Sequence, residues 1–183
     1  MKIIIKNEKD YKKFIKRIII YKSIFYKYVH FELESYIDCE YMDIIINGLN
    51  IKKRNKRIQY IYDEICKILN SKMDLNICEF KENKCIVQRE NHSLNCNGCC
   101  LKCIHQKDGR CNTENLTCKL FYCPTIKKKY KITKMKDIIP FKLFSLRQRL
   151  IFKTDFFASR EEHLSDLYHY SLIVAMYNIF RRN

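Results

Sequence analysis

The chain has 183 residues, of which 47% are hydrophobic, and this is enough apolar material for one domain with a buried core. Thirteen Tyr and eleven Phe argue against disorder, whereas only three Gly and two Pro argue against a barrel or sandwich with many tight turns. The excess of 36 Lys and Arg over 20 Asp and Glu gives a formal net charge of +16. Such a charge attracts nucleic acid or anionic lipid, although AT-rich codon usage also enriches lysine without selection for binding.

The sequence contains no segment typical of secretion or membrane insertion. Only three consecutive apolar residues stand near the start before charge returns, so a signal-peptide core is not expected. The longest apolar run, from Tyr170 to Phe180, is about half the length that a membrane-spanning helix needs. We therefore expect a cytoplasmic protein.

Three amphipathic helices are predicted in the N-terminal part. Residues 9–34 carry an apolar row at helical spacing, and a second, short helix is expected over residues 36–48, ending near Gly48. The third helix begins near Asn55, a suitable N-cap, and has the most regular apolar stripe. This stripe consists of Ile58, Ile61, Tyr62, Ile65, Ile68 and Leu69. Cys66 lies beside the stripe and Cys39 is isolated, so both are interpreted as small core residues.

The middle of the chain changes character. Between residues 77 and 88, two short apolar runs flank the polar tetrapeptide KENK, which predicts a β-hairpin. Cys78 and Cys85, within these runs, either pack beneath the other cysteines or act as outer metal ligands, and packing is preferred. Pro124 is expected to end an element. The lysine-rich run after it is a solvated linker or a strip that binds the nucleic-acid backbone, and the linker is preferred.

A helix is predicted at the C-terminal end. Ser159 and Glu162 match a capping box, and the helix is expected to continue to about Arg181. From Tyr170 onward it is apolar nearly all round, which suits a central position or a partner surface. The fold class is therefore mainly α, with helices around a loop-rich, metal-binding cysteine module that carries a short β-hairpin. The expected units, within one domain, are a helical part (1–75), the cysteine module (76–124), a basic linker (125–137) and a second helical part (138–183).

Seven of the eleven cysteines lie between residues 96 and 123. Closely spaced thiols in a chain without a secretion signal are typical of metal ligation rather than of disulfides. Two C-x2-C pairs interleave, and in each pair the spacer lets both sulfurs reach one ion. The seven are Cys96, Cys99, Cys100, Cys103, Cys111, Cys118 and Cys123. With His105 as an eighth donor, the set is large enough for two tetrahedral zinc ions.

An iron–sulfur cluster is the alternative cofactor. Cys96, Cys100 and Cys103 have the C-x3-C-x2-C spacing by which radical SAM enzymes hold a [4Fe–4S] cluster. That enzyme class is excluded, because its barrel needs more strands than this chain supplies and because Lys102 replaces the expected aromatic residue. The spacing still allows a cubane whose fourth ligand is Cys111, Cys118 or Cys123. Thiolate ligands suit both zinc and iron–sulfur clusters, so ligand type does not decide between them.

The segments GCCLKC, DGRC and TCKLFYC resemble the YkgJ-type cysteine-rich proteins, a family described as zinc- or iron-chelating. The family pattern opens with C-x2-C-x2-CC and continues with a DGRC-like turn and a closing C-x4-C. The residues that match it are Cys96, Cys99 and Cys100 in the opening, Cys111 in the turn, and Cys118 and Cys123 in the close. Ser93 stands where the first cysteine would be, and the segment between the halves is shortened, so Cys103 would supply the missing thiolate. The resemblance covers residues 96–123, implies metal binding and favours an iron–sulfur cluster over zinc.

DNA or RNA is the partner that the positive charge favours. The candidate contact residues are Lys127, Lys128, Lys129, Lys131, Lys52, Lys53, Arg54 and Arg57. The preferred function is a metal-binding module whose basic surface contacts nucleic acid or a protein. The alternatives are a small redox or radical iron–sulfur enzyme, and a phage or mobile-element accessory protein that acts by protein contact through the C-terminal helix. The sequence contains no P-loop, dinucleotide fingerprint or H-E-x-x-H motif, so catalysis stays open.

Overall fold

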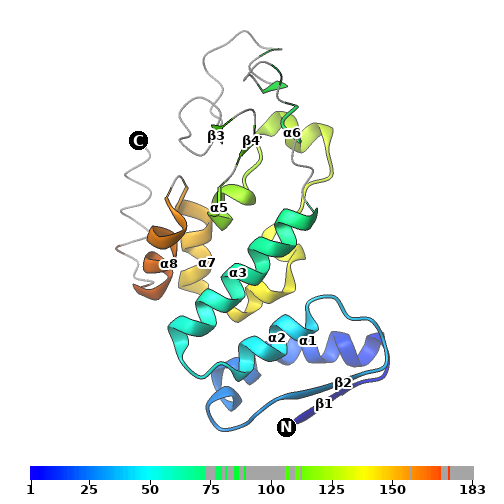
Figure 1. The fold of residues 1–183 in the computed structure, drawn as a ribbon. Coiled ribbons are helices and arrows are strands. Elements are labelled where there is room, and N and C mark those ends of the chain that lie inside the picture. The colour runs from blue at the N-terminus through cyan, green and yellow to red at the C-terminus, as the bar shows by residue number, and fades with distance from the viewer. Residues whose placement is uncertain are drawn as a thin grey trace.

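The protein is mainly helical, as predicted, in a computed structural model that describes residues 1–72, 77–79, 81, 85–86, 89, 106–107, 110–111, 113–156, 158–169 and 173 (Figure 1). The α-helices are α1 (Glu8–Ser23), α2 (Met42–Asn50), α3 (Arg54–Lys72), α5 (Leu116–Lys119), α6 (Pro124–Lys129), α7 (Leu146–Thr154) and α8 (Arg160–His169). The 3-10 helices are η1 (Phe25–Lys27), η2 (Met135–Asp137) and η3 (Ile139–Leu143). The strands are β1 (Lys2–Ile5), β2 (Glu32–Ser35), β3 (Gln106–Lys107) and β4 (Arg110–Cys111). In Figure 1, α3 rises from the end that holds β1 and β2 toward the end that holds α6, β3 and β4.

Two parallel strands, which the sequence analysis did not predict, precede and follow the first helix along the chain. β1 pairs with β2 in the register Lys2 to Glu32, and α1 connects them. The single helix predicted over residues 9–34 is therefore wrong beyond Ser23, where α1 ends and η1 follows. Alternating burial in β1 and the short Phe31–Leu33 alternation in β2 give each strand an apolar face toward the core. Pairing of β2 with β1 buries this apolar face, and this favours a strand over a continuation of the helix past Ser23.

The side chain of Asn50, at the end of α2, holds the backbone at the start of β2. Its Oδ1 accepts a hydrogen bond from the Phe31 amide at 2.7 Å, and its Nδ2 donates to the Phe31 carbonyl at 2.8 Å. The carboxamide thus pairs with one residue as a neighbouring strand would. Phe31 itself is buried among the core aromatics, with its ring 5.8 Å from that of Tyr21.

One hydrophobic core joins residues from both ends of the chain, from Ile3 in β1 to Leu167 in α8. The stripe predicted for the third helix is confirmed: five of its six members are buried, and Ile68 is half-buried. Cys66 is also buried, and Cys39 packs against the core, as expected for both. Phe152 of α7 lies at the centre of the aromatic contacts, with ring centroids 4.8–6.3 Å from its neighbours.

Two elements of the cysteine-bearing end differ from the predictions. Ile86 and Arg89 are helical, and the Arg89 amide donates to the Cys85 carbonyl, so the second strand of the hairpin predicted over residues 77–88 is not formed there. A short hairpin does exist, but it pairs β3 with β4 on either side of the sequence Asp108-Gly109, a dipeptide typical of two-residue hairpins.

Pro124 begins an element rather than ending one. It occupies the first turn of α6, where its missing N–H costs nothing because no partner is needed there. Ile126 of this helix is buried, so the first half of the predicted basic linker is a packed helix.

The capping box predicted for the last helix is confirmed. The Ser159 hydroxyl accepts from the Glu162 amide at 3.2 Å, and the Glu162 carboxylate accepts from the Ser159 amide at 2.8 Å. Apart from the exposed Ile173, the apolar continuation from Tyr170 to Arg181 lies outside the described residues.

Replacing Asn50 with Ala should destabilise the protein by about 1–3 kcal/mol, because it leaves a partly buried amide and carbonyl of Phe31 without their partners. Asn47→Ala, on the exposed face of the same helix, is the matched control and should change stability by less than about 0.5 kcal/mol. Urea unfolding of both variants measures the difference. Equal effects would show that the Asn50 side chain does not hold β2.

Candidate functional site

Among the described residues of the cysteine segment, the short helix α5, which carries Cys118, is held by several buried hydrogen bonds. Asn115 is its N-cap, and its Oδ1 accepts from the amides of Thr117 and Cys118 at 2.8 and 3.1 Å. The Nδ2 of the same side chain donates to the carbonyls of Asp155 and Ala158, both at 3.0 Å. Asn115 is fully buried, so one amide group ties α5 to the turn between α7 and α8.

A buried polar network links α5 to the centre of the core. The Tyr62 hydroxyl of α3 donates to the Glu114 carbonyl at 2.9 Å and accepts from the Leu116 amide at 3.1 Å. It also lies 3.1 Å from Nδ1 of His163, a fully buried residue of α8. On the other side of the ring, His163 Nε2 is 3.4 Å from the hydroxyl of Thr117. The network satisfies polar groups that burial would otherwise penalise.

Burial shifts both titratable groups at the centre of this network toward their neutral forms. The pKa of Tyr62 is raised, first by desolvation, and burial lowers the pKa of His163 to about 3. The carboxylate of Asp155, 3.8 Å from His163 Nε2, acts in the opposite direction on the imidazole. We assign His163 as neutral because it is fully buried and the carboxylate is beyond hydrogen-bond distance. His163 is therefore a core residue of α8.

Two further contacts fix α5 to α3. The buried Lys119 ammonium donates to Oδ1 of Asn70 at 2.6 Å, and the Cys66 thiol donates to the Glu114 carbonyl at 3.5 Å. Burial raises the pKa of the Cys66 thiol to about 12, which favours the protonated thiol of a core residue.

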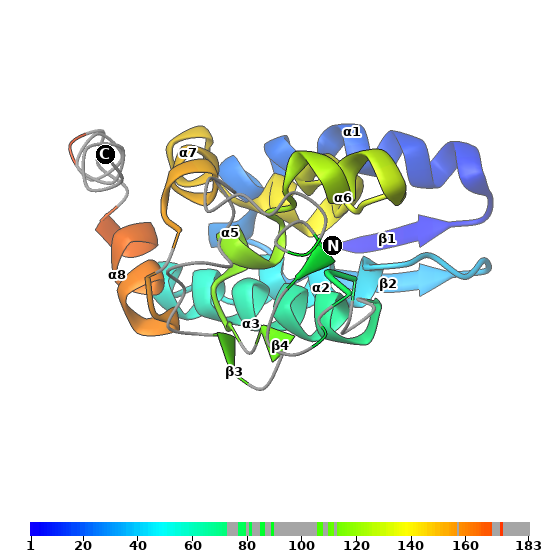
Figure 2. The same cartoon turned by 90° about the horizontal axis from the view of Figure 1, so that it is seen from above.

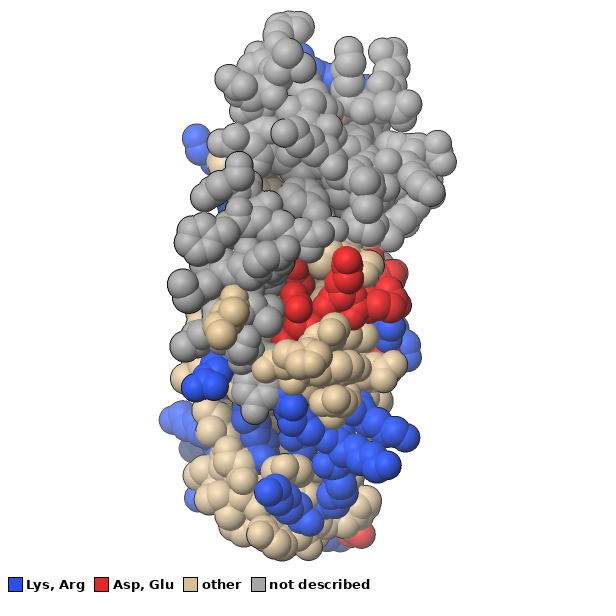
Figure 3. Space-filling view, turned by 90° about the vertical axis from the view of Figure 1, so that its left-hand side faces the viewer, with Lys and Arg blue, Asp and Glu red and all other residues tan. Residues whose placement is uncertain are grey.

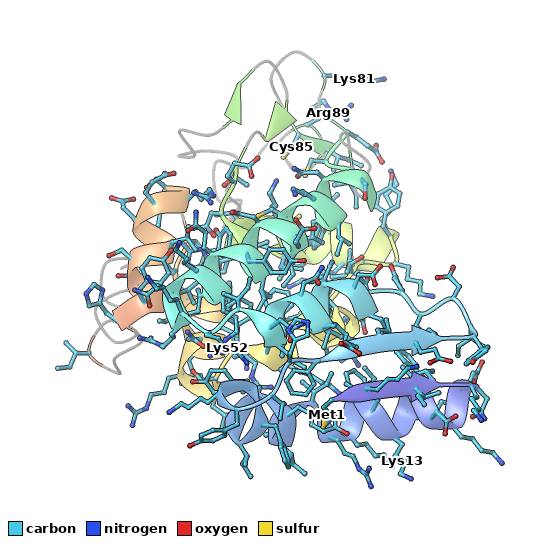
Figure 4. All side chains as sticks on the ribbon, turned by 60° about the horizontal axis from the view of Figure 1, so that its bottom comes forward. Met1, Lys13, Lys52, Lys81, Cys85 and Arg89 are labelled. Atoms are coloured by element: carbon cyan, nitrogen blue, oxygen red, sulfur yellow. The ribbon has the colours of Figure 1, made fainter. Side chains whose placement is uncertain are left out.

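Three cysteines meet in a second, smaller hydrophobic cluster at this end of the molecule. Cys85 is buried in it with Ile86, Tyr122 and Ile126, and Cys78 and Cys123 pack against it. Figure 4 shows Cys85 and Arg89 beside each other beyond α3, with Lys81 further out. The Ile86 amide donates to the Cys78 carbonyl at 3.0 Å, and the Arg89 guanidinium donates to the Glu79 carbonyl at 2.6 Å. The preferred interpretation of Cys78 and Cys85 as packing residues agrees with these positions.

The remaining predicted ligands are only partly described. Cys111 ends β4, Cys118 lies in α5 and Cys123 is the N-cap of α6. The other five fall outside the described residues: Cys96, Cys99, Cys100, Cys103 and His105. Among the residues that are described, no group of three His, Cys, Asp or Glu side chains could hold a metal ion.

The two predicted basic strips differ in how their side chains are used. In the first, the Lys52 ammonium donates to the carbonyls of Tyr26 and Val29, and Arg54 donates to the Tyr168 carbonyl. Arg57 stacks on the Tyr26 ring at 4.2 Å, while Lys53 is exposed. Most of this strip therefore binds its own chain, at the end of the molecule opposite Cys85 (Figure 4).

Other cationic side chains lie near this first strip. Lys22 donates to the carbonyls of Lys142 and Phe144 at 3.1 and 2.8 Å. Burial, and then the nearby charges of Arg149 and Arg57, lower its pKa to about 8. Figure 3 shows Lys and Arg side chains gathered over the lower part of this face, below a group of acidic side chains.

The second strip lines a groove of about 790 Å³ between α5, α6, the segment 130–137 and the end of α7. Seen from above, α5 lies between α6 and α7 (Figure 2). Five lysines and one aspartate surround the groove: Lys127, Lys131, Lys134, Lys136, Lys153 and Asp137. Lys128 is exposed outside it, and Lys129 forms an ion pair with Glu79, which also accepts from the Tyr130 hydroxyl.

The groove also has aromatic walls, which the sequence reasoning missed apart from Tyr130. Phe121 and Phe156 form an edge-to-face pair with centroids 5.1 Å apart, and Phe152 contributes from α7. The ammonium of Lys127 lies 5.8 Å from the centre of the Phe121 ring. The only sequence signal was the run LFYCP beside the lysines, because Phe152, Lys153 and Phe156 come from a segment about 30 residues later.

No family model, curated protein or solved structure matches the chain significantly. None of the described helices is both long enough and apolar enough to cross a membrane. The resemblance to the YkgJ-type proteins therefore stays a prediction that depends on the cysteine spacing alone.

The neutral state of His163 should make the protein sensitive to acid. Its pKa in the folded protein lies below the ordinary value of 6.5, so its contribution to stability is complete above about pH 6.5 and is lost as the pH falls toward 3. The loss should approach 1.4 kcal/mol per pH unit from this group. Urea unfolding between pH 7 and pH 4 measures it.

The matched comparison uses the two histidines of α8. His163→Gln should lower stability at pH 7 but give a shallower acid slope, while His169→Gln, at an exposed position, should keep the wild-type slope. An unchanged slope in His163→Gln would mean that His163 is already protonated in the folded state through Asp155.

Proposed function

We propose that the chain is a cysteine-ligated metal protein whose basic surface contacts nucleic acid. The metal is an iron–sulfur cluster or one or two zinc ions, held by the cysteines between residues 96 and 123. The supporting observation is that α5, the element carrying Cys118, is fixed by buried hydrogen bonds although the segment supplies little apolar core of its own.

Thiolate chemistry supports the metal part of the proposal. Soft sulfur ligands bind zinc and iron–sulfur clusters, and a loop poor in apolar residues gains its folding free energy from the metal. Cys118 projects from a helix whose position is set by Asn115 and Tyr62, so one donor is held before the metal binds. The complete site requires donors from the cysteines outside the described residues.

Charge supports the nucleic-acid part. The formal net charge is +16, and cationic side chains lie together around Lys22, Arg57 and Arg149 and around the groove beside α6. A surface of this kind neutralises phosphates and releases counterions, which makes binding strongly dependent on salt.

The first experiment is purification without oxygen, followed by an absorption spectrum and elemental analysis of the same sample. Iron with acid-labile sulfide and a brown colour would identify a cluster, and reversible reduction would then indicate a redox function. A colourless protein with stoichiometric zinc would identify a structural metal. Protein that is folded and free of both metals would refute the proposal.

Replacing Cys118 with Ser should lower both the metal content and the thermal stability, because a serine hydroxyl stays protonated and binds these metals poorly. Cys66→Ser is the matched control: its thiol is buried against α5, so the change can lower stability but should leave the metal content unchanged. Metal analysis and thermal unfolding of both variants measure the difference. Equal metal content in the two variants would exclude Cys118 as a ligand.

A further inference from the structure

The groove beside α6 combines positive charge with aromatic walls. Five lysines surround it, and among the described residues none of them forms an ion pair. Its walls also include the half-buried rings of Phe121, Tyr130 and Phe156, and the buried Phe152 lies beneath them. Positive charge alone would suit any polyanion, and aromatic walls alone would suit any flat apolar ligand.

We infer that this groove binds single-stranded nucleic acid, with phosphates on the lysines and bases against the aromatic rings. This inference rests on the proposed function and names the surface and the form of nucleic acid. Single strands expose both a charged backbone and the faces of their bases, and proteins that bind them combine a positive groove with aromatic stacking platforms. A duplex hides the base faces, so it would leave the rings of Phe121 and Phe156 unused.

The basic surface continues beyond the groove. A second hollow of about 460 Å³ shares Met135, Lys136 and Lys153 with the first and adds Lys142 and Arg149. Exposed apolar side chains, Leu146 and Leu150, line this second hollow. Arg149 in turn lies close enough to Lys22 to lower its pKa. A strand several nucleotides long therefore has a continuous positive path from α6 along α7.

The groove has a firm base. Thr117, one of its lining residues, belongs to the network that includes Tyr62 and His163, and the neighbouring Asn115 fixes the start of α5. On the far side, the Tyr130 ring is held by its hydroxyl hydrogen bond to Glu79. Rings that are already in position lose little conformational entropy when a base stacks on them.

The decisive experiment measures binding of fluorescent single-stranded oligonucleotides, DNA and RNA in separate arms, to the full chain at several salt concentrations. The groove variant carries Lys127→Glu, Lys131→Glu and Lys134→Glu. The matched control carries Lys9→Glu, Lys13→Glu and Lys16→Glu on the exposed face of α1, which changes the net charge equally. The groove variant should bind at least about tenfold more weakly than the wild type, and the slope of log K against log salt concentration should be shallower by roughly 2. The control should change little in both quantities.

Aromatic stacking is tested separately. Phe121→Leu keeps an apolar side chain but removes the ring, and should weaken binding by roughly tenfold without changing the salt dependence. Phe25→Leu, at an exposed position on η1, is the control and should bind normally. Photocrosslinking with thiouridine-containing RNA should label the peptide that contains Phe121 and Tyr130.

The other possible outcomes separate the groove inference from the proposed nucleic-acid function. The inference would be overturned if the groove and α1 variants lost affinity equally, or if the protein preferred duplex to single strands. It would also be overturned if polyglutamate competed as well as the oligonucleotide, which would indicate an acidic peptide as the ligand. Binding that persists in the groove variant would leave the proposed nucleic-acid function in place on another surface. Absence of any binding by the wild type would refute both, and the metal content, measured on the same samples, decides the metal part independently.

Discussion

The structure of the cysteine-bearing end depends on the buried side chain of Asn115. Its carboxamide accepts two amides that begin α5 and donates to two carbonyls in the turn that joins α7 to α8. Every hydrogen-bonding position of that group is therefore used. The start of α5 is in this way held by polar contacts as well as by the buried side chain of Leu116, and Cys118 and one wall of the groove take their positions from it.

The buried hydrogen bonds that position α5 also influence how the stability of the protein depends on pH. Hydrogen bonds have direction, so the Tyr62 hydroxyl and the His163 ring specify one position for α5 where apolar packing alone would allow several. The same burial favours the neutral form of the His163 imidazole. Protonation of this ring in acid therefore destabilises the folded protein, whereas an apolar residue at this position would not respond to pH. The surrounding core, including Phe152 packed on both Tyr62 and His163, keeps water out and makes both effects strong.

Local patterns predicted local structure well. The stripe of α3 and the Ser159–Glu162 capping box involve residues three or four positions apart, and both are present. The β1–β2 pair was missed because it joins positions 30 residues apart, and a four-residue strand has little periodicity of its own. Pro124 was misread because proline ends a helix and also suits the first turn of one, and only the burial of Ile126 decides between them. The proposed ligand set depends on cysteine spacing alone, and most of it lies outside the described residues.

Two lysine-rich strips of similar composition therefore differ in the contacts of their side chains, and the sequence alone cannot separate them. In the first strip, Lys52 and Arg54 bind the backbone carbonyls of Tyr26, Val29 and Tyr168, and Arg57 stacks on the Tyr26 ring. In the second strip, the groove lysines form no ion pair among the described residues and lie in a groove that aromatic rings also line. A lysine bound to a carbonyl must break that contact to reach a phosphate, which subtracts from its contribution to binding. A lysine beside a ring keeps its charge available, and the ring adds a surface for a base. The combination of aromatic rings with lysines that no described carbonyl or carboxylate binds makes the groove beside α6 the stronger candidate for the nucleic-acid interface.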